Sequence, residues 1–423
     1  MFGTLLSGVQ SARYGAVAAL LLATTAHAAD WITLRVAGVE LVSDAPEKTA
    51  REALQRLAQI QSILPSQPQA DAAPLRIFLF AKENEYRAYA PDNTAAGFYT
   101  SGFERDYIAM HSGAMPRVVA HEYVHSAAHQ RKVTRPAWLE EGLAEFYSNY
   151  DGRQLGAPIQ EHLKLLEKAW RSANEMNQPP SLDALFYAQS WALVHMLRRE
   201  PQFPERITPR MLEELRVYLK TIRGTAVKAP APVAQRAPAE PVSVLNALLL
   251  QADLALHSQK PALAKALYTQ AAREFPNSSA VATGLGTLAY AEGDAEAARS
   301  HLSHALQLND REALAWFQLA LTENNQTALE RAVELNPNLA EARVLLGVRA
   351  TDLGDFDTAL LHLEQATRLL PRKSYAWYSL GYAQTKQGDA IGARRSLEQA
   401  LATATSPEQR QMAATLLDSL GPN

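Results

Sequence analysis

The chain has 423 residues, enough for two or three domains, and its content of 47% hydrophobic and 20% charged residues is that of a globular protein. A formal net charge of −3 gives no reason to expect a nucleic-acid partner or general binding to a membrane surface. The chain has no cysteine, which excludes disulfides, thiolate nucleophiles and cysteine-ligated zinc. A site made of histidine and glutamate is the common zinc chemistry that remains.

Residues 1–28 have the pattern of a secretory signal peptide. Arg13 supplies a positive charge, an apolar run follows at 16–23, and Ala26-His27-Ala28 fits the small-x-small cleavage pattern. The alternative is an N-terminal membrane anchor, but the apolar run is short for a bilayer span. We therefore expect a periplasmic or secreted protein that has no stable membrane span once the signal peptide is removed.

Residues 29–223 mix strand and helix patterns, which predicts an α+β domain. Alternating apolar residues predict a hairpin over 31–42 that turns at Ala37-Gly38, and Pro46 begins a helix with an apolar stripe. Residues 97–102 are expected to form a loop. The other predicted elements are strands at 75–80 and 107–110, helices at 45–64 and 83–89, a helix that carries residues 121–125, and a largely helical stretch at 154–223.

Residues 121–125 have the sequence His-Glu-Tyr-Val-His, the H-E-x-x-H pattern. On a helix, His121 and His125 lie on one face, so both imidazoles can bind one Zn²⁺, with Glu122 beside them as a general base. With 11 His and 44 Asp plus Glu in 423 residues, chance supplies at most roughly 0.03 such matches. The alternative, a surface helix with two solvated histidines, is the weaker interpretation.

A second motif follows, in which residues 138–146 have the sequence Trp-Leu-Glu-Glu-Gly-Leu-Ala-Glu-Phe. H-E-x-x-H followed by W-L-x-E-G-x-A resembles the gluzincin zinc metallopeptidases. The resemblance implies that Glu141 is the third zinc ligand and that Glu145 orients a ligand histidine. The apolar pattern of the segment does not choose between Glu140 and Glu141, so that choice rests on the resemblance. Fifteen residues separate the second histidine from Glu141, fewer than the family usually shows.

Gluzincins often place a Tyr or His from a later helix against the developing oxyanion. In the helix predicted at 186–195, Tyr187 is the first candidate and His195 the second, and a plain core aromatic or surface histidine stays open as the alternative for each. The resemblance also implies an edge strand along the cleft, which fits the strand at 107–110. On a straight helix the Cα of His129 would be roughly 12 Å from that of the first histidine, too far to share its ion.

The stretch Gly224–Val242 is rich in proline and alanine, which predicts a semi-extended linker without packed elements. After it, from 243 to 423, the chain repeats with a period of 34 residues. Units begin near Leu245, Ser279, Ala313, Ala340 and Ser374, with Leu-Gly pairs at 285–286, 346–347 and 380–381 and Gly-Asp turns at 293–294, 354–355 and 388–389. This pattern resembles tetratricopeptide repeats (TPRs), although the third unit is short enough to predict a truncated helix pair.

The expected fold is therefore an α+β gluzincin-like metallopeptidase domain at 29–223, followed by an all-α TPR solenoid with a concave groove. The resemblance implies an exported zinc peptidase in which Glu122 takes a proton from water and passes it to the leaving amine. A peptide or protein would be the substrate, and the repeats would recruit that substrate or a protein partner. The alternative is a TPR-based binding scaffold whose metallopeptidase-like domain is inactive.

Overall fold

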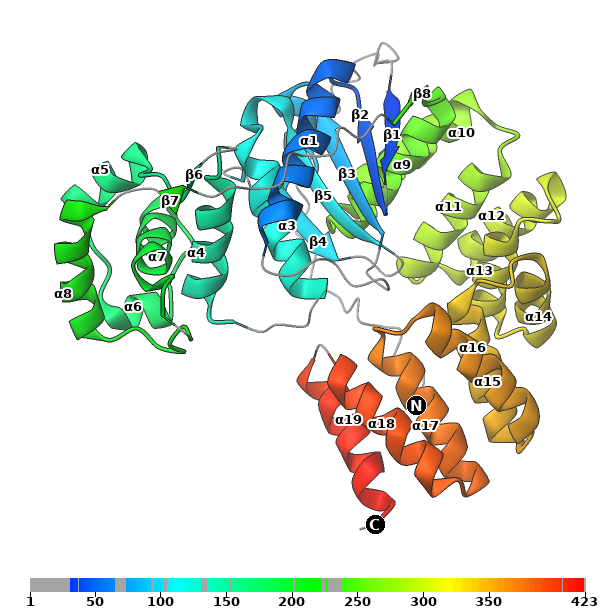
Figure 1. Ribbon diagram of the computed structural model, residues 1–423. Helices are drawn as coiled ribbons and strands as arrows, with labels where there is room; N and C mark the ends of the chain where they lie inside the picture. The colour runs from blue at the N-terminus through cyan, green and yellow to red at the C-terminus, as the bar shows by residue number, and fades with distance from the viewer. Residues whose placement is uncertain are drawn as a thin grey trace. The chain divides into compact units, whose positions relative to one another are not determined.

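The computed structural model describes residues 31–36, 38–64, 74–92, 95–101, 105–130, 135–151, 154–200, 202–222, 225–226, 237–404 and 406–421. The predicted signal peptide at 1–28 lies outside the described residues, as does most of the predicted linker. The chain forms two compact units that divide between Ala264 and Lys265 (Figure 1). Within the described ranges, every helix is too short or too polar to serve as a transmembrane span.

A six-stranded mixed sheet is the centre of the first unit, in the order β4-β5-β3-β2-β1-β8. Strands β2, β3 and β5 run parallel to one another, and the remaining pairs are antiparallel. The predicted hairpin at 31–42 and the predicted strands at 75–80 and 107–110 are confirmed. The strands are β1 (Ile32–Val36), β2 (Val39–Ser43), β3 (Leu75–Phe80), β4 (Gly97–Ser101), β5 (Asp106–His111) and β8 (Ala239–Pro241).

Strand β4 corrects two predictions at once. Residues 97–101 were expected to be a loop, but they pair with β5 along their whole length. The hydrogen bonds of a neighbouring strand stabilise this strand, and a five-residue sequence pattern does not reveal them. Strand β5 was expected at the edge, but it is internal, and β4 is the edge strand. A Cβ on Gly97 would lie 2.3 Å from Val118 on the next helix, so glycine allows β4 to approach that helix closely.

Two helices pack with the sheet into one apolar core, α1 (Glu47–Ile63) and α3 (Arg117–Gln130). The predicted apolar stripe of α1 is buried there through Leu54, Leu57 and Ile60. Helix α3 carries the H-E-x-x-H motif and lies beside β4 and β5 (Figure 1). Short helices α2 (Glu83–Arg87) and η2 (Ser112–Ala114) complete this part.

A second apolar core is made mainly by helices, with Ile159 and Ile207 from the segments between them. It is centred on Trp138, Trp191 and Phe186, and helix α4 (Ala137–Ser148) contributes to both cores, since its Ala144 belongs to the first. The motif helices α3 and α4 therefore meet where the two cores join. The other elements here are α5 (Gln160–Lys168), α6 (Ala173–Asn177), α7 (Ala184–Leu197), α8 (Pro209–Tyr218), η3 (Leu219–Thr221) and the strand pair β6 (Gln154–Leu155) and β7 (Thr225–Ala226).

The end of the predicted linker is packed, contrary to expectation. Strand β8 pairs with β1, and its proline stands at a sheet edge, where a missing N–H is tolerated. Helix α9 (Val244–His257), predicted to open the repeat domain, belongs to the first unit. Its Asp253 accepts hydrogen bonds from the Tyr107 hydroxyl (2.8 Å) and from Arg76 (3.1 Å), and the His257 ring stacks on Tyr107 at 4.3 Å. Helix α9 therefore packs within the first compact unit, and the division between the two units falls inside the next helix, which begins at Pro261.

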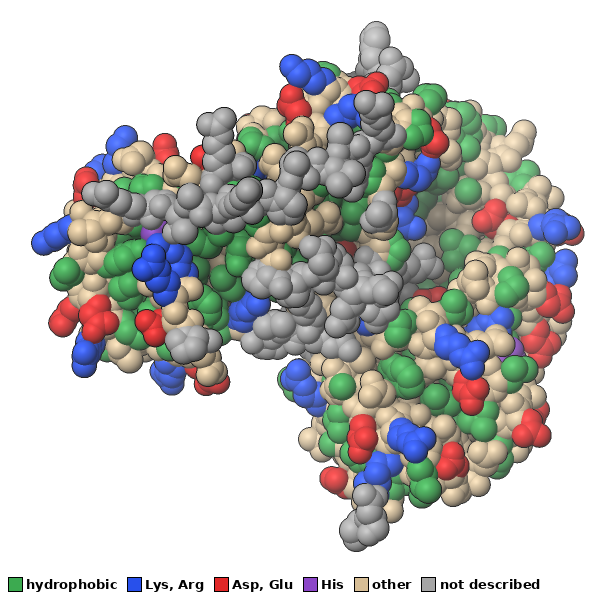
Figure 2. Space-filling view, in the orientation of Figure 1, with side chains coloured by type: hydrophobic (Ala, Val, Ile, Leu, Met, Phe, Trp, Pro, Cys, Tyr) green, Lys and Arg blue, Asp and Glu red, His purple; other side chains and the backbone are tan. Residues whose placement is uncertain are grey.

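The remaining helices form the predicted array of antiparallel pairs. In three pairs the glycine of the Leu-Gly motif leaves room for a leucine of the next helix: a Cβ on Gly347, for example, would lie 2.4 Å from Leu363. The third pair is shortened as predicted, and Asn324 ends its first helix in the left-handed conformation with φ 52°. Basic and acidic side chains are interspersed over the face of the chain seen in Figure 2. The helices are α10 (Pro261–Glu274), α11 (Ser279–Ala291), α12 (Ala295–Leu308), α13 (Ala313–Glu323), α14 (Gln326–Leu335), α15 (Ala340–Leu353), α16 (Phe356–Leu369), α17 (Ser374–Gln387), α18 (Ala390–Thr403) and α19 (Pro407–Ser419).

Candidate metal centre

Three side chains from α3 and α4 converge in the first unit. In the part of the chain that the structure describes, His121, His125 and Glu141 form the single group of His, Asp or Glu whose ligand atoms all lie within 4.8 Å of one another. The Nε2 atoms of the two histidines are 3.1 Å apart, and each is 3.4 Å from Oε2 of Glu141. The four-residue spacing on α3 and the crossing of α4 thus bring together the three residues expected as zinc ligands.

The second ring nitrogen of each histidine faces a carboxylate. Nδ1 of His121 lies 3.2 Å from Oε1 of Glu145, the residue expected to orient a ligand histidine. Nδ1 of His125 lies 3.3 Å from Oε1 of Glu140, whose other oxygen is 3.2 Å from Arg135. Glu140, which the sequence left as a rival ligand, therefore faces the outer nitrogen of a histidine. Carboxylates in these positions hold the proton on Nδ1 and direct the lone pair of Nε2 inward.

The arrangement fits a Zn²⁺ ion. Two Nε2 lone pairs directed at each other across 3.1 Å repel unless a cation or a proton lies between them. Oε2 of Glu141 is a buried oxygen that has no hydrogen-bond donor, and such an atom destabilises the fold unless a cation meets it. Two imidazoles and one carboxylate are also a common donor set of catalytic zinc sites, which keep a fourth position for water.

The histidines and carboxylates of the site shift one another's pKa values in the direction that favours a bound positive charge. Burial opposes charge on His125, but the carboxylates of Glu140 and Glu141 outweigh it and raise the pKa of His125 to about 10. Burial likewise opposes charge on Glu141, but the two histidines lower its pKa to about 2. The site is therefore built to hold positive charge.

Glu122 and Tyr187 lie next to the three ligands. The Glu122 side chain is buried, which raises its pKa, and the backbone N–H of Tyr99 on edge strand β4 donates a hydrogen bond to it. The ring of Tyr187, on α7, meets the ring of His121 edge-on at 6.2 Å. Burial, together with the charges of Glu141 and Glu122, raises the pKa of Tyr187, so its phenol stays protonated at neutral pH.

His195, the second oxyanion candidate, is not at the site. It is fully buried eight residues further along α7, where Nε2 lies 2.7 Å from the carbonyl oxygen of Gly156 and Nδ1 2.7 Å from the Tyr218 hydroxyl. Eight residues are about two turns, so the helix carries His195 along its axis into the second apolar core. His129 is exposed at the end of α3 and is not among the grouped ligands.

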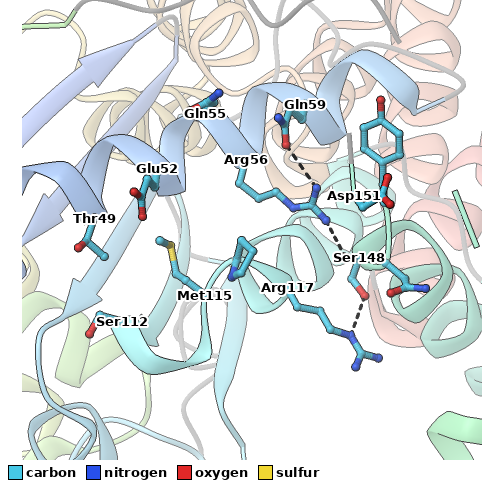
Figure 3. Close-up of a pocket in the computed structure, with 13 residues that line it drawn as sticks. Thr49, Glu52, Gln55, Arg56, Gln59, Ser112, Met115, Arg117, Ser148 and Asp151 are labelled. Atoms are coloured by element: carbon cyan, nitrogen blue, oxygen red, sulfur yellow. Dashed lines mark hydrogen bonds between the residues drawn. The ribbon is translucent and has the colours of Figure 1, made fainter. Parts of the chain in front are cut away.

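Behind Glu145 lies a network that the sequence analysis did not single out. Oε2 of Glu145 lies 3.0 Å from Nε2 of His162 on α5 and pairs with the guanidinium of Arg117 at the start of α3. Arg117 also lies 3.3 Å from Oγ of Ser148 and lines a surface pocket of about 630 Å³, with Arg56 above it (Figure 3). Nothing in the spacing of these residues marks them, because α5 reaches Glu145 only through the fold.

Comparisons with known proteins point to the repeats. A tetratricopeptide-repeat family model matches residues 249–313 and 344–410. A TPR repeat-containing protein of Pseudomonas aeruginosa is 36% identical over 83 residues, which are 20% of this chain and 79% of that protein. Tetratricopeptide repeat protein 36 of Mus musculus is 42% identical over 62 residues, 15% of this chain and only 33% of that protein.

Solved structures give weaker likenesses to the same class. YrrB, described as a TPR protein with an unusual peptide-binding site, is 21% identical and covers 40% of this chain and 90% of its own, with a TM-score of 0.32. The type IV pilus biogenesis factor PilW is 16% identical and covers 43% of this chain and 87% of its own, with a TM-score of 0.37.

The repeating helix pairs and the sequence matches define a solenoid of protein-interaction repeats attached to an α+β unit. The chain belongs to the tetratricopeptide-repeat proteins. Its array is accordingly a scaffold for protein partners. The family match begins at 249, within α9, and does not include the helices that carry the candidate metal centre, so the gluzincin resemblance of the first unit stays a prediction.

Proposed function

We propose that the first unit is a zinc-dependent peptidase whose ligands are His121, His125 and Glu141. The observation that carries the proposal is their convergence around one point: Oε2 of Glu141, which has no hydrogen-bond donor, lies 3.4 Å from each of the two Nε2 atoms. Zn²⁺ bound there would polarise the scissile carbonyl and lower the pKa of a water molecule.

Two side chains would carry the proton chemistry. Glu122 would accept a proton from the attacking water and deliver it to the leaving amine, and its raised pKa suits both halves of that task. Tyr187 would donate its hydroxyl hydrogen to the oxyanion, since its phenol stays protonated. The ring contact between Tyr187 and His121 supports this role, whereas the buried position of His195 removes it from consideration.

The TPR array would bring protein substrates or partners to this unit. A recruiting surface on the same chain raises the effective concentration of a bound substrate near the proposed site. The signal-peptide pattern at 1–28 supports export, so we propose that the substrates are periplasmic or extracellular proteins.

The test uses the purified full chain and compares three forms: wild type, Glu122→Gln, and Glu167→Gln as a matched control on the exposed face of α5. About one zinc per chain is expected in all three by metal analysis. Wild type and the control should cleave a peptide library at equal rates, while Glu122→Gln should lose about 10²–10⁴-fold in rate, because the amide cannot accept the proton. Equal turnover by Glu122→Gln and wild type would overturn the catalytic role.

The second candidate is a binding scaffold whose zinc site is structural or inactive. The observation that favours it is that the family model matches the repeats. Full zinc content with no turnover by wild type, on a library of peptides and unfolded proteins, would support this candidate. A structural site has no use for Glu122, so its placement beside the ligands favours the peptidase.

A further inference from the structure

The two oxygens of Glu145 have different partners. Oε1 faces Nδ1 of His121 at 3.2 Å, while Oε2 receives His162 at 3.0 Å and Arg117. The side chains of Glu145 and His162 are 11% and 10% exposed, so these contacts lie mostly out of water, where a charge-assisted hydrogen bond is strong. The Glu145 carboxylate thus links helix α3, which carries the two candidate ligand histidines, to helix α5.

Chemistry fixes the direction of these hydrogen bonds. An ionised carboxylate can only accept hydrogen bonds, and a guanidinium can only donate them. Nε2–H of His162 and the guanidinium of Arg117 therefore both donate to Oε2 of Glu145. The 3.3 Å separation between Arg117 and Nε2 of His162 follows from both donors meeting the same oxygen. Burial, aided by the charge of Arg117, lowers the pKa of His162 to about 4, so its ring is neutral at physiological pH.

We propose that His162 is a positioning residue of the metal centre: by holding Oε2 of Glu145 it fixes Oε1 against His121 and so sets the orientation of that ligand ring. The inference rests on the proposed function only in requiring that the centre binds Zn²⁺. Without the N–H of His162, Arg117 alone holds Oε2, so the Glu145 carboxylate can rotate and His121 loses a fixed acceptor that directs its Nε2 toward the ion.

Two further features make His162 suited to this task. Its ring packs edge-on against Trp191 at 5.6 Å, so it is held by the second apolar core. Arg117 is held in turn by Ser148, whose hydroxyl donates to the backbone carbonyl of Glu145 at 2.9 Å. The carboxylate is therefore held by donors from α5 and α3, and the donor from α3 is itself held by Ser148 on the helix that carries Glu145.

The chain contains a matched control for this histidine. His195 is also buried, and its ring also lies 5.6 Å from the ring of Trp191. Its ring nitrogens face Gly156 and Tyr218 rather than Glu145. Replacing either histidine by leucine removes a buried imidazole from the same core, but only His162→Leu removes a donor to Glu145.

The experiment uses the full chain, stripped of metal and reloaded, as wild type, His162→Leu, His162→Gln and His195→Leu. Zinc affinity is measured by competition with a chromophoric chelator, coordination by the visible absorption of the Co²⁺ form, and folding by the thermal midpoint of the metal-free protein. We expect His162→Leu to weaken zinc binding about 10–100-fold and to alter the Co²⁺ spectrum. His162→Gln should restore most of the affinity, since its amide N–H can replace Nε2–H. His195→Leu should lower the thermal midpoint with zinc affinity within about threefold of wild type.

The outcomes separate the two hypotheses. Wild-type affinity and spectrum in a folded His162→Leu would overturn the positioning role and leave the proposed function intact, and so would an equal loss in His195→Leu. A wild-type chain that binds neither metal would overturn the proposed function and this inference together. Arg117→Leu removes the other donor to Oε2 and gives the same test from α3 if His162→Leu does not fold. Weakened zinc binding with a changed spectrum is the supporting result, and unchanged values contradict the proposal.

Discussion

The repeat array and the first unit build their structures in different ways. In the array, Gly347 packs against Leu363, and the same glycine-leucine contact recurs between Gly381 and Leu397, at the same separation in sequence. In the first unit, the candidate metal centre brings together side chains from α3, α4, α5 and α7, and their spacing in the sequence is irregular. A change in the array should therefore act within one helix pair, whereas a change at a helix crossing of the first unit should reach the metal centre.

The largest expected effect concerns the boundary between the two units. A chain that ends at residue 242 lacks α9 and exposes Tyr107, which is 3% exposed in the full chain. It also loses the buried contacts of Asp253, so we expect it to be unfolded or insoluble. A chain that ends at residue 260 keeps α9 and should show cooperative unfolding and bind zinc.

Thermal unfolding and metal analysis of the two truncated chains decide the matter. If both truncations fold and bind zinc equally, α9 belongs energetically to the repeats, and the comparison between the two units would have to be drawn at residue 243 after all.

A smaller effect is expected from a matched pair of glycines. A Cβ on Gly142 of α4 would lie 2.5 Å from the carbonyl oxygen of Ser190 on α7, a backbone atom that moves only if the helix moves. Gly142→Ala should therefore destabilise the first unit by about 1–3 kcal/mol. It should also weaken zinc binding roughly tenfold or more, because α4 carries Glu141 and Glu145.

The control is Gly381→Ala in the array, where a Cβ would lie 2.7 Å from Cγ of Leu397, a side chain that can shift. The gain in helix propensity, about 1 kcal/mol, partly offsets that strain, and zinc affinity should not change. Chemical denaturation and zinc competition on both variants test the pair. Loss of zinc in Gly381→Ala would contradict the independence of the array.

A further expected effect is a pH dependence of zinc binding that is confined to the metal centre. His125 has a pKa of about 10 in the metal-free fold, above the ordinary value of 6.5, so between these values the folded chain holds a proton that zinc must displace. Stability from this proton is fully present below pH 6.5 and is lost as the pH rises through 10. The apparent affinity for zinc should accordingly rise about tenfold per pH unit from pH 6.5 to 8.5.

Zinc competition at three pH values, corrected for protonation of the chelator, measures this slope. A flat profile would mean that both histidines are already neutral in the metal-free fold, and that Glu140 and Glu141 do not hold a proton at His125.

Much of the architecture follows from local sequence. The period of the repeats, the hairpin at 31–42 and helix α1 are present where the sequence predicts them. The spacing of His121 and His125 places both on one helix face, because an α-helix has 3.6 residues per turn. In each of these cases neighbours within one or two elements decide the structure, so pattern and propensity are sufficient.

Tertiary structure alone decided the rest. Residues 97–101 become an edge strand because β5 offers them hydrogen bonds. Strand β8 pairs with β1, which would otherwise be an unpaired sheet edge, and α9 packs within the first unit. Helix α7 places Tyr187 next to the metal centre and His195 in a separate core. The close crossing of α7 and α4 at Gly142 decides which of the two residues lies at the site. His162 meets Glu145 only after two cores have packed against each other. Sequence spacing is local information, whereas the meeting of these side chains depends on the packing of helices that are distant in the chain.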